Sequence, residues 1–326
     1  MARLLRTLDE FPDDLRGGAI AIGNFDGVHQ GHAGLVEQLK GLAKCFDGPA
    51  VILTFDPPPV AILVPDRLPS APLTSMARRA ELLGRLGVDA MVAYPTDRNL
   101  LNLSPAEFFQ QKIVRGLGAR AMVEGPNFRF GKDRVGNIEL LRSLCEASSV
   151  TLEIAKAKQD ESGVMISSSR IREALAEGDL KSVNTMLTQF YQITGIVAKG
   201  AQRGRELGFP TANLEDIANL LPAFGVYAGQ VELEGSMHAA AVNIGPNPTF
   251  GEQRSKVEVH ILDWKGTIYG ERLEVTLLKR IREVRKFDCV DSLTQQLQQD
   301  IQACRGSFSA APGKGWSSES RILRDS

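Results

Sequence analysis

Residues 19–32 read Ala-Ile-Ala-Ile-Gly-Asn-Phe-Asp-Gly-Val-His-Gln-Gly-His, and this stretch decides the fold of the first half of the chain. Its first four residues are an apolar run typical of a strand, and the helical spacing of apolar residues in 33–46 predicts a helix after it. The stretch therefore predicts a strand, a glycine-rich turn and a helix. The N-terminus of a helix carries unpaired N–H groups and partial positive charge, which suits a phosphate. His29 and His32, two of only four histidines, lie at this turn and favour a functional site over an ordinary surface turn.

Composition bounds the class of protein. A chain of 326 residues has room for about two domains, and a hydrophobic fraction of 43% allows a sizeable core. The net charge of −1 gives no overall attraction to nucleic acid or to an acidic membrane. The four cysteines are far apart and form no Cys-x-x-Cys pair, which argues against a structural zinc site and a disulfide framework.

The N-terminal segment does not have the pattern of a signal peptide, because four acidic residues interrupt it. They are Asp9, Glu10, Asp13 and Asp14. No apolar run approaches the roughly 18 residues that a membrane-spanning helix needs. The sequence therefore predicts a soluble cytoplasmic protein with neither nucleic acid nor a membrane as a partner.

Apolar runs alternate with segments of helical periodicity through the first half of the chain. The predicted strands are residues 50–55, 90–94, 121–124 and 150–154. The predicted helices are residues 75–86, a helix that starts at Ser104 with a capping box, and residues 137–147. This alternation predicts a doubly wound, mostly parallel sheet, whose ligands bind beyond the carboxyl ends of its strands.

Two further polar turns follow predicted strands. Residues 125–134 mix glycine, aromatic residues and cations, which suits a nucleotide or flavin phosphate but equally suits a surface loop with buried aromatics. Residues 167–172, Ser-Ser-Ser-Arg-Ile-Arg, open a predicted helix that reaches Glu177. A serine at an N-cap needs no function, yet three serines and two arginines at a helix start favour a polyphosphate site.

From Gln192 the pattern changes to short alternating segments separated by glycine and proline turns. They are residues 192–198, 226–233, 238–243, 256–262 and 272–278. This pattern predicts a small antiparallel barrel or sandwich, and residues 292–304 predict a terminal helix. The last residues, rich in serine, glycine and charge, have the composition of a disordered tail.

Residues 200–213 alternate glycines with cations, which suits a backbone that wraps phosphates. If 210–213 is extended, Thr211 and Asn213 lie on one face, and two neutral oxygens suit a Mg²⁺ that also binds ATP phosphates. Taken alone, Pro-Thr-Ala-Asn is better explained as a simple turn. Glu258 alternates with apolar neighbours, so it is either a solvent-facing residue or, beside a phosphate site, a base for a hydroxyl.

The three stretches of the first half resemble the N-terminal module of the prokaryotic bifunctional riboflavin kinase/FMN adenylyltransferase (FAD synthetase) family, over residues 19–179. The resemblance implies a Rossmann-like α/β nucleotidyltransferase fold that transfers AMP from ATP to FMN, with His29 and His32 contacting ATP phosphates. The implied ATP and FMN residues are Gly23, Asn24, Phe25, Asp26, Gly31, Asn127, Ser168, Ser169 and Arg170. Members often have His in the Phe-x-Pro-x-Pro segment, where this chain has Pro58.

The string Gly-Arg-x-Leu-Gly-Phe-Pro-Thr-Ala-Asn makes residues 192–300 resemble the riboflavin kinase module of the same family. The resemblance implies an all-β six-stranded barrel, Mg²⁺ bound by Thr211 and Asn213, and Glu258 as catalytic base. The implied ATP and riboflavin residues are Gly200, Arg203, Arg205, Gly208, Phe209, Pro210, Thr211 and Asn213, with Lys199 as a further phosphate contact.

The sequence therefore predicts an adenylyltransferase domain at 1–186, a riboflavin kinase domain at 187–305 and a tail at 306–326. Its expected ligands are riboflavin, FMN, FAD and ATP with Mg²⁺, and the sequence does not indicate an oligomeric state. Two alternatives are an adenylyltransferase for another phosphorylated vitamin and a flavin-binding regulator with a degraded site. The presence of the kinase-like half, which would make FMN, argues against the first alternative. The intact residues His29, His32, Thr211, Asn213 and Glu258 argue against the second.

Overall fold

The computed structural model describes residues 1–64, 71–156, 158–200, 204, 208–246, 249 and 255–309. These residues fall into two compact units. One comprises the described residues of Met1–Ser70 and Thr74–Ser167, and the other those of Ala71–Leu73 and Ser168–Ser326. Arg203, Arg205 and residues 310–326, which include most of the expected tail, lie outside the described residues.

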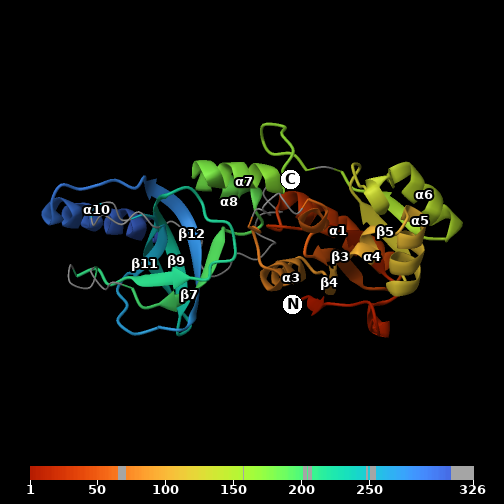
Figure 1. Ribbon diagram of the computed structural model, residues 1–326, viewed down its shortest axis with the longest axis horizontal. Helices are drawn as coiled ribbons and strands as arrows, with labels where there is room; N and C mark the ends of the chain where they lie inside the picture. The colour runs from red at the N-terminus through yellow and green to blue at the C-terminus, as the bar shows by residue number, and fades with distance from the viewer. Residues whose placement is uncertain are drawn as a thin grey trace. The chain divides into compact units, whose positions relative to one another are not determined.

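The first unit is built on a six-stranded sheet in which all pairings are parallel (Figure 1). Its strands are β1 (Arg3–Leu5), β2 (Ala19–Ile22), β3 (Ala50–Asp56), β4 (Ala90–Pro95), β5 (Ala121–Glu124) and β6 (Thr151–Ile154). The spatial order is β1-β4-β3-β2-β5-β6, so the winding direction reverses between β2 and β5. Ligands of open parallel sheets bind at the carboxyl ends beside such a reversal. The predicted parallel sheet is confirmed, and the glycine-rich turn after β2 lies at the reversal.

Helices cover both faces of this sheet, because both faces of its strands are apolar. Ala21 and Ile52 pack with helices α1 and α3 on one face, and Ile20 packs with α5, η2 and α6 on the other. The helices are α1 (Gln30–Cys45), α2 (Pro59–Leu63), α3 (Met76–Arg85), α4 (Arg98–Leu101), α5 (Pro105–Phe108) and α6 (Ile138–Ala147), with the π-helix η2 (Phe109–Gly116) and the 3-10 turns η1 (Asp13–Leu15) and η3 (Lys132–Arg134). The capping box predicted at Ser104 is present, with Glu107 as its partner.

The second unit contains a closed six-stranded antiparallel barrel in the order β10-β11-β8-β7-β12-β9 (Figure 1). Its strands are β7 (Gln192–Ala198), β8 (Ala212–Glu215), β9 (Gly225–Leu233), β10 (Ser236–Gly245), β11 (Lys256–Ile261) and β12 (Arg272–Arg282). Alternate residues fill the barrel, such as Val257, Val259 and Ile261, which are at most 6% exposed. Closure of the barrel decides against the sandwich that the alternating pattern also allowed.

Helices of the second unit pack on the outside of this barrel. Helices α7 (Ser168–Glu177) and α8 (Leu180–Met186) precede it, and α10 (Val290–Ser309) follows it. Asn184 of α8 donates to the Leu277 carbonyl at 3.1 Å and accepts the Tyr191 N–H at 2.7 Å. Arg282 of β12 pairs with Asp300 of α10, whose side chain is 2% exposed, at 2.7 Å. These contacts fix both helical elements to β12 and its neighbours.

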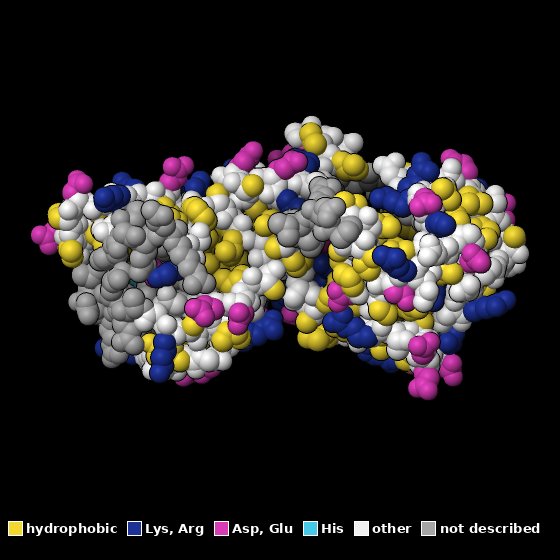
Figure 2. All heavy atoms as spheres, in the orientation of Figure 1, with side chains coloured by type: hydrophobic (Ala, Val, Ile, Leu, Met, Phe, Trp, Pro, Cys, Tyr) yellow, Lys and Arg dark blue, Asp and Glu magenta, His cyan; other side chains and the backbone are white. Residues whose placement is uncertain are grey.

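Several elements of the described chain are absent from the sequence prediction: strand β1, the 3-10 turns η1 and η3, and helices α2, α4 and α8. Strand β1 is only three residues long and carries no alternation that a sequence could show, and α8 follows α7 after a two-residue break at Gly178. The terminal helix is also longer at both ends than the predicted 292–304. On the face seen in Figure 2, acidic and basic side chains of the described residues are interspersed, in keeping with the small net charge. None of the helices in the described part of the chain is long and apolar enough to cross a membrane.

Candidate functional site

Two histidines close the start of α1 by capping each other. His29 is the N-cap residue, and its Nδ1 accepts the His32 backbone N–H at 3.3 Å. In return, Nδ1 of His32 accepts the His29 backbone N–H at 3.3 Å. The two rings stack with centroids 3.6 Å apart, and Phe25 packs on His32 with centroids 4.8 Å apart. Both histidines therefore lie at the helix start, as the sequence predicts.

The environment of the pair fixes its charge and its tautomers. Burial lowers the pKa of His29 to about 4, against a smaller opposing effect of the Asp26 carboxylate. Burial, with His29 and Arg79 as neighbours, holds the pKa of His32 well below its usual value. Both rings are therefore neutral near pH 7. Because each Nδ1 accepts an N–H, the ring proton lies on Nε2, and each ring presents an Nε2–H donor of the kind that binds a phosphate oxygen.

A buried arginine that the sequence prediction missed holds the turn between β2 and α1. Arg79 of α3 donates to the Asn24 carbonyl at 2.6 Å and to Asp26 Oδ1 at 2.8 Å. The Thr74 backbone N–H donates to the same Asp26 oxygen at 3.1 Å, and the Thr74 hydroxyl oxygen accepts the Gly27 N–H at 3.0 Å. Arg79 is 4% exposed. Asp26 therefore shapes the turn through Arg79, while the Asn24 side chain is exposed.

One feature of the sequence could have revealed Arg79. It falls on the apolar stripe of α3, beside the buried Ala80 and Leu83. A charged residue on such a stripe requires a buried partner, because an unpaired buried charge is strongly unfavourable. Its partner, Asp26, lies in the very motif that the sequence singled out.

The turn has an unusual backbone that explains the need for this support. Phe25 and Val28 have left-handed φ angles of 48° and 43°. That conformation is costly for a β-branched residue and persists only where surrounding contacts enforce it. Gly23 passes from β2 into the turn and donates to the Leu53 carbonyl at 3.1 Å. At Gly31 a Cβ would lie 3.0 Å from the His29 ring, so glycine there lets the ring occupy its place at the cap.

The carboxyl end of β5 supplies a buried acid beside this turn. Glu124 is 1% exposed and accepts the Ile22 N–H of β2 at 2.8 Å. Burial raises the pKa of its carboxyl well above the usual value, because a low-dielectric environment disfavours the charged form. In the following loop Asn127 is exposed, and the Phe128 and Phe130 rings stack at 5.5 Å.

The three expected triphosphate residues occupy the first turn of α7. Ser168, Ser169 and Arg170 are the first residues of that helix, in the second unit. This is the helix start that the sequence predicts for them. Helix N-termini favour anions through their unpaired N–H groups.

In the barrel, two of the predicted kinase residues, Asn213 and Glu258, form a row across two neighbouring strands. Asn213 of β8 lies directly opposite Glu258 of β11. Both are partly exposed and lie on the outer face, since the adjacent Leu214 and Val257 face the interior. Directly opposed residues of an antiparallel pair have Cβ atoms about 5 Å apart. The strand pairing therefore holds an amide oxygen and a carboxylate next to each other.

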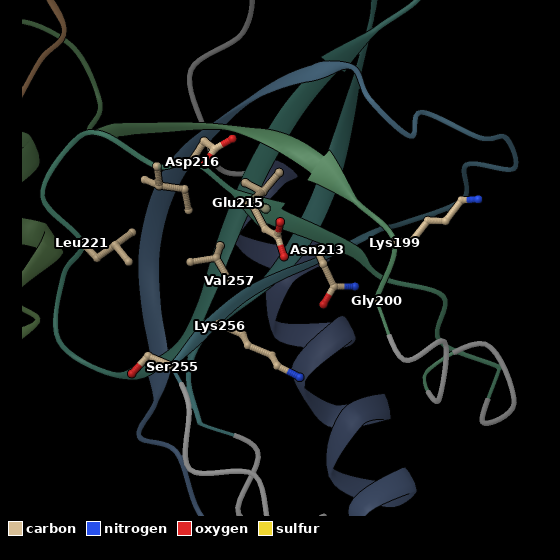
Figure 3. A pocket seen from close by; sticks show the side chains of 11 residues that line it. Lys199, Gly200, Asn213, Glu215, Asp216, Leu221, Ser255, Lys256 and Val257 are labelled. Carbon is tan, nitrogen blue, oxygen red and sulfur yellow. The ribbon is translucent and has the colours of Figure 1, made fainter.

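A cavity of about 430 Å³ opens beside this row (Figure 3). Asn213 and Lys256 line it together with Lys199, whose side chain extends away from the Asn213 amide in the figure. Gly200 also lines the cavity, and a Cβ there would lie 2.1 Å from Asn213 Nδ2. Glycine at 200 therefore leaves space for the Asn213 side chain.

The segment before β8 brings the remaining described kinase residues to the same place. Gly208 has a φ of 84°, in the left-handed region, and the Phe209 N–H donates to the Gly204 carbonyl at 2.7 Å. The Pro210 carbonyl lies 2.7 Å from Nδ1 of His260, and the His260 and Phe209 rings meet edge to face. Thr211 then connects Pro210 to β8.

The donor atoms here suit Mg²⁺ bound largely by phosphate and water. Among the described residues, no group of three or more His, Cys, Asp or Glu could hold a metal ion. A Thr hydroxyl and an Asn amide oxygen are hard, neutral donors, which fit a Mg²⁺ whose charge is balanced by a nucleotide.

Both halves of the chain match family models. Residues 11–170 match the family described as FAD synthetase, and residues 187–308 match the family described as riboflavin kinase. The two matches cover the histidine turn and the Asn213–Glu258 row respectively.

Relatives match over nearly the whole chain. Bifunctional riboflavin kinase/FMN adenylyltransferase from Pseudomonas fluorescens is 33% identical over 93% of this chain and 97% of its own length. The protein of the same description from Listeria monocytogenes is 36% identical over 93% of this chain and 95% of its own. A crystal structure described as a macrolide-efflux protein from Streptococcus pneumoniae is 30% identical, covers 93% of this chain and 98% of its own, and has a TM-score of 0.82.

Proposed function

Because the chain belongs to the bifunctional riboflavin kinase/FMN adenylyltransferase family, we propose that the histidine turn serves one of its activities and the barrel row the other. The enzyme makes FMN from riboflavin and FAD from FMN, with ATP as the co-substrate. We assign residues 1–186 to adenylyl transfer, residues 187–305 to the kinase and residues 306–326 to a tail. The ranges of the two family matches support this division.

In adenylyl transfer, an FMN phosphate oxygen attacks the α-phosphorus of ATP and pyrophosphate leaves. No covalent enzyme intermediate is needed, so the residues act by positioning ATP and stabilising charge on its phosphates. The Nε2–H groups of His29 and His32 donate to phosphate oxygens. Because both rings are neutral, they orient the phosphates by directed hydrogen bonds without delivering a proton.

The other residues of this activity follow the family motif by position. Ser168, Ser169 and Arg170 bind the triphosphate, and Asn127 lies near the FMN phosphate. Asp26, held by Arg79, maintains the turn that carries Gly23 and Phe25. Gly31 allows the close approach of the His29 ring.

In the kinase reaction, Glu258 takes the proton of the riboflavin 5′-hydroxyl as the hydroxyl oxygen attacks the γ-phosphorus of ATP, and ADP leaves. Thr211 and Asn213 hold Mg²⁺, which would neutralise charge on the phosphates when bound. The observation that supports this proposal is the direct pairing of Asn213 with Glu258, by which the side-chain amide and the carboxylate are neighbours. Lys199, Arg203 and Arg205 contact phosphates, and the Gly200 and Gly208–Pro210 backbone shapes the nucleotide site.

We further propose that the enzyme acts in the cytoplasm, where ATP is supplied. Its ligands are riboflavin, FMN, FAD and ATP, with Mg²⁺ as the required ion.

Two variants of the full chain test the division of labour. Glu258→Ala should abolish FMN formation from riboflavin and leave FAD formation from supplied FMN unchanged. His29→Asn should do the reverse, because Asn is a good N-cap residue but lacks the Nε2–H donor. Separation of the flavins after reaction with Mg·ATP gives both rates, and Glu232→Ala, on an exposed barrel position, is the matched control for Glu258. Loss of both reactions in a folded variant would contradict the assignment.

A further inference from the structure

A histidine outside the assigned kinase residues contacts the backbone of the Pro210–Asn213 segment. Nδ1 of His260 lies 2.7 Å from the Pro210 carbonyl oxygen. A carbonyl oxygen only accepts, so Nδ1 of His260 carries the proton and donates. The Phe209 ring packs edge to face on the imidazole, with centroids 5.9 Å apart.

The strand register shows why this contact matters. Ala212 pairs with Val259 and Asn213 with Glu258, in an antiparallel ladder that ends at Ala212. Continued by one residue, the same register places Thr211 opposite His260. Beyond the end of the ladder, the hydrogen bond from the His260 side chain, rather than a backbone hydrogen bond, connects the two segments. It holds Pro210, the residue immediately before Thr211.

On the outer face of the two strands, Asn213 and Glu258 are directly opposed. Extending this register by two residues in each direction aligns Glu215 with Lys256 and Thr211 with His260. His260 and Glu258 project from the same face of β11, because they are two residues apart. The strand that carries the base thus also holds the segment that carries the metal-binding hydroxyl.

From this geometry we infer that His260 is a positioning residue of the riboflavin kinase site, which holds the Thr211 hydroxyl in place for Mg²⁺. The inference rests on the proposed roles of Thr211, Asn213 and Glu258. His260 itself touches neither substrate nor metal in this scheme. Its loss frees one end of the Pro210–Asn213 segment while the pairing of Asn213 with Glu258 remains.

Three substitutions of His260 test whether the hydrogen bond from its Nδ1 to the Pro210 carbonyl is required. Nδ2 of Asn occupies nearly the place of Nδ1 of His, whereas Nδ1 has no counterpart in Phe, and the Gln amide extends toward the Nε2 position. His260→Phe and His260→Gln should each raise the Mg²⁺ concentration for half-maximal riboflavin phosphorylation about fivefold, the equivalent of one hydrogen bond. His260→Asn should stay within about twofold of the unsubstituted enzyme by the same measure.

Two internal controls belong to the same chain. FAD formation from supplied FMN should be unchanged in all three variants, since it uses the other site. His238 belongs to the neighbouring strand β10 and projects from the face of the sheet opposite to that of His260. His238→Phe should therefore leave the Mg²⁺ dependence unchanged. If His260→Phe fails to fold, the comparison of Asn with Gln decides alone.

Equal Mg²⁺ dependence in all His260 variants, or equal impairment by Asn and Gln, would overturn the inference. A merely structural role would lower the unfolding temperature without changing the Mg²⁺ dependence of the folded fraction. Thr211→Val and Glu258→Ala, measured alongside, separate this outcome from failure of the proposed site. If these two retain kinase activity, the site assignment is wrong. If they lose it while His260→Phe does not change, only the role of His260 is wrong.

Discussion

Replacing Arg79 by Met tests the support of the histidine turn. The substitution keeps the length and apolar stem of the side chain, but removes the cation that pairs with Asp26 at 2.8 Å and the donor to the Asn24 carbonyl at 2.6 Å. Both charged side chains are nearly buried, at 4% and 12% exposure. Breaking a buried pair by removing one partner costs about 3–5 kcal/mol, because the other charge stays buried and unpaired. We expect a loss of that size in the free energy of unfolding of the first unit.

A double-mutant cycle that combines Arg79→Met with Asp26→Asn measures the interaction energy between the two side chains. The amide removes the unpaired charge, so the double variant should recover at least about half of the loss, a coupling of at least about 1.5 kcal/mol. Arg78→Met is the matched control, because Arg78 pairs with Glu81 at a more exposed position and such pairs contribute about 0–1 kcal/mol.

Urea unfolding with separate probes is the assay. Of the two tryptophans, Trp264 and Trp316, only Trp264 lies among the described residues, and it belongs to the second unit, so its fluorescence follows that unit. Loss of FAD formation follows the first unit, and far-ultraviolet circular dichroism follows the secondary structure of both units, so a transition in circular dichroism that tryptophan fluorescence does not show belongs to the first unit. The reasoning is wrong if Arg79→Met costs no more than Arg78→Met, or if Asp26→Asn recovers nothing. At low urea, Arg79→Met should also slow FAD formation and leave FMN formation intact.

Three other predictions follow from titration and packing. The pKa of His29 is about 4 in the folded chain, against an ordinary value of 6.5 in the unfolded chain, so between these pH values the unfolded chain binds one more proton. The contribution of His29 to the free energy of unfolding, about 3 kcal/mol, is therefore full above pH 6.5 and is lost as the pH falls toward 4. Urea midpoints at pH 7 and pH 5 should therefore differ less in His29→Asn than in the unsubstituted enzyme. Burial raises the pKa of Glu124 in the folded chain, so ionisation of the unfolded chain above pH 4.5 costs stability that a neutral side chain does not lose. Glu124→Gln keeps an acceptor for the Ile22 N–H and should therefore stabilise the chain increasingly as pH rises above 4.5. Urea midpoints at pH 5 and pH 8 measure this difference. Asp300→Ala leaves Arg282 without its buried partner and should cost about 3 kcal/mol in the unfolding followed by tryptophan fluorescence.

The local parts of the fold could be predicted from the sequence, because the signals are local. The β2–turn–α1 stretch, the capping box at Ser104 and the two-faced pattern of β11 all depend on residues within a few positions of one another. The local sequence of the Thr211–Asn213 stretch fits either a turn or a strand, and pairing with β11 decides for a strand from Ala212 onward.

The remaining features depend on distant residues that no local pattern connects. Arg79 reaches Asp26 across 53 positions and His260 reaches Pro210 across 50. Closure of the barrel likewise needs β9 to pair with both β10 and β12, while each strand alone fits a sandwich equally well. The pKa values of His29 and Glu124 could not be predicted either, because burial sets them and burial results from the whole fold.

The alternation along β11 has a consequence for how this enzyme can change during evolution. Odd-numbered residues fill the barrel and even-numbered residues lie on its outer face, where Glu258 is the proposed base, so neighbouring positions are under separate constraints and can be substituted independently. The strand cannot change in length in the same way. Inserting or deleting one residue in the strand before Glu258 would turn the carboxylate inward and a valine outward, destroying core and site together. Variation among functional descendants should therefore accumulate as substitutions within β11 and as length changes only in the loops at its ends.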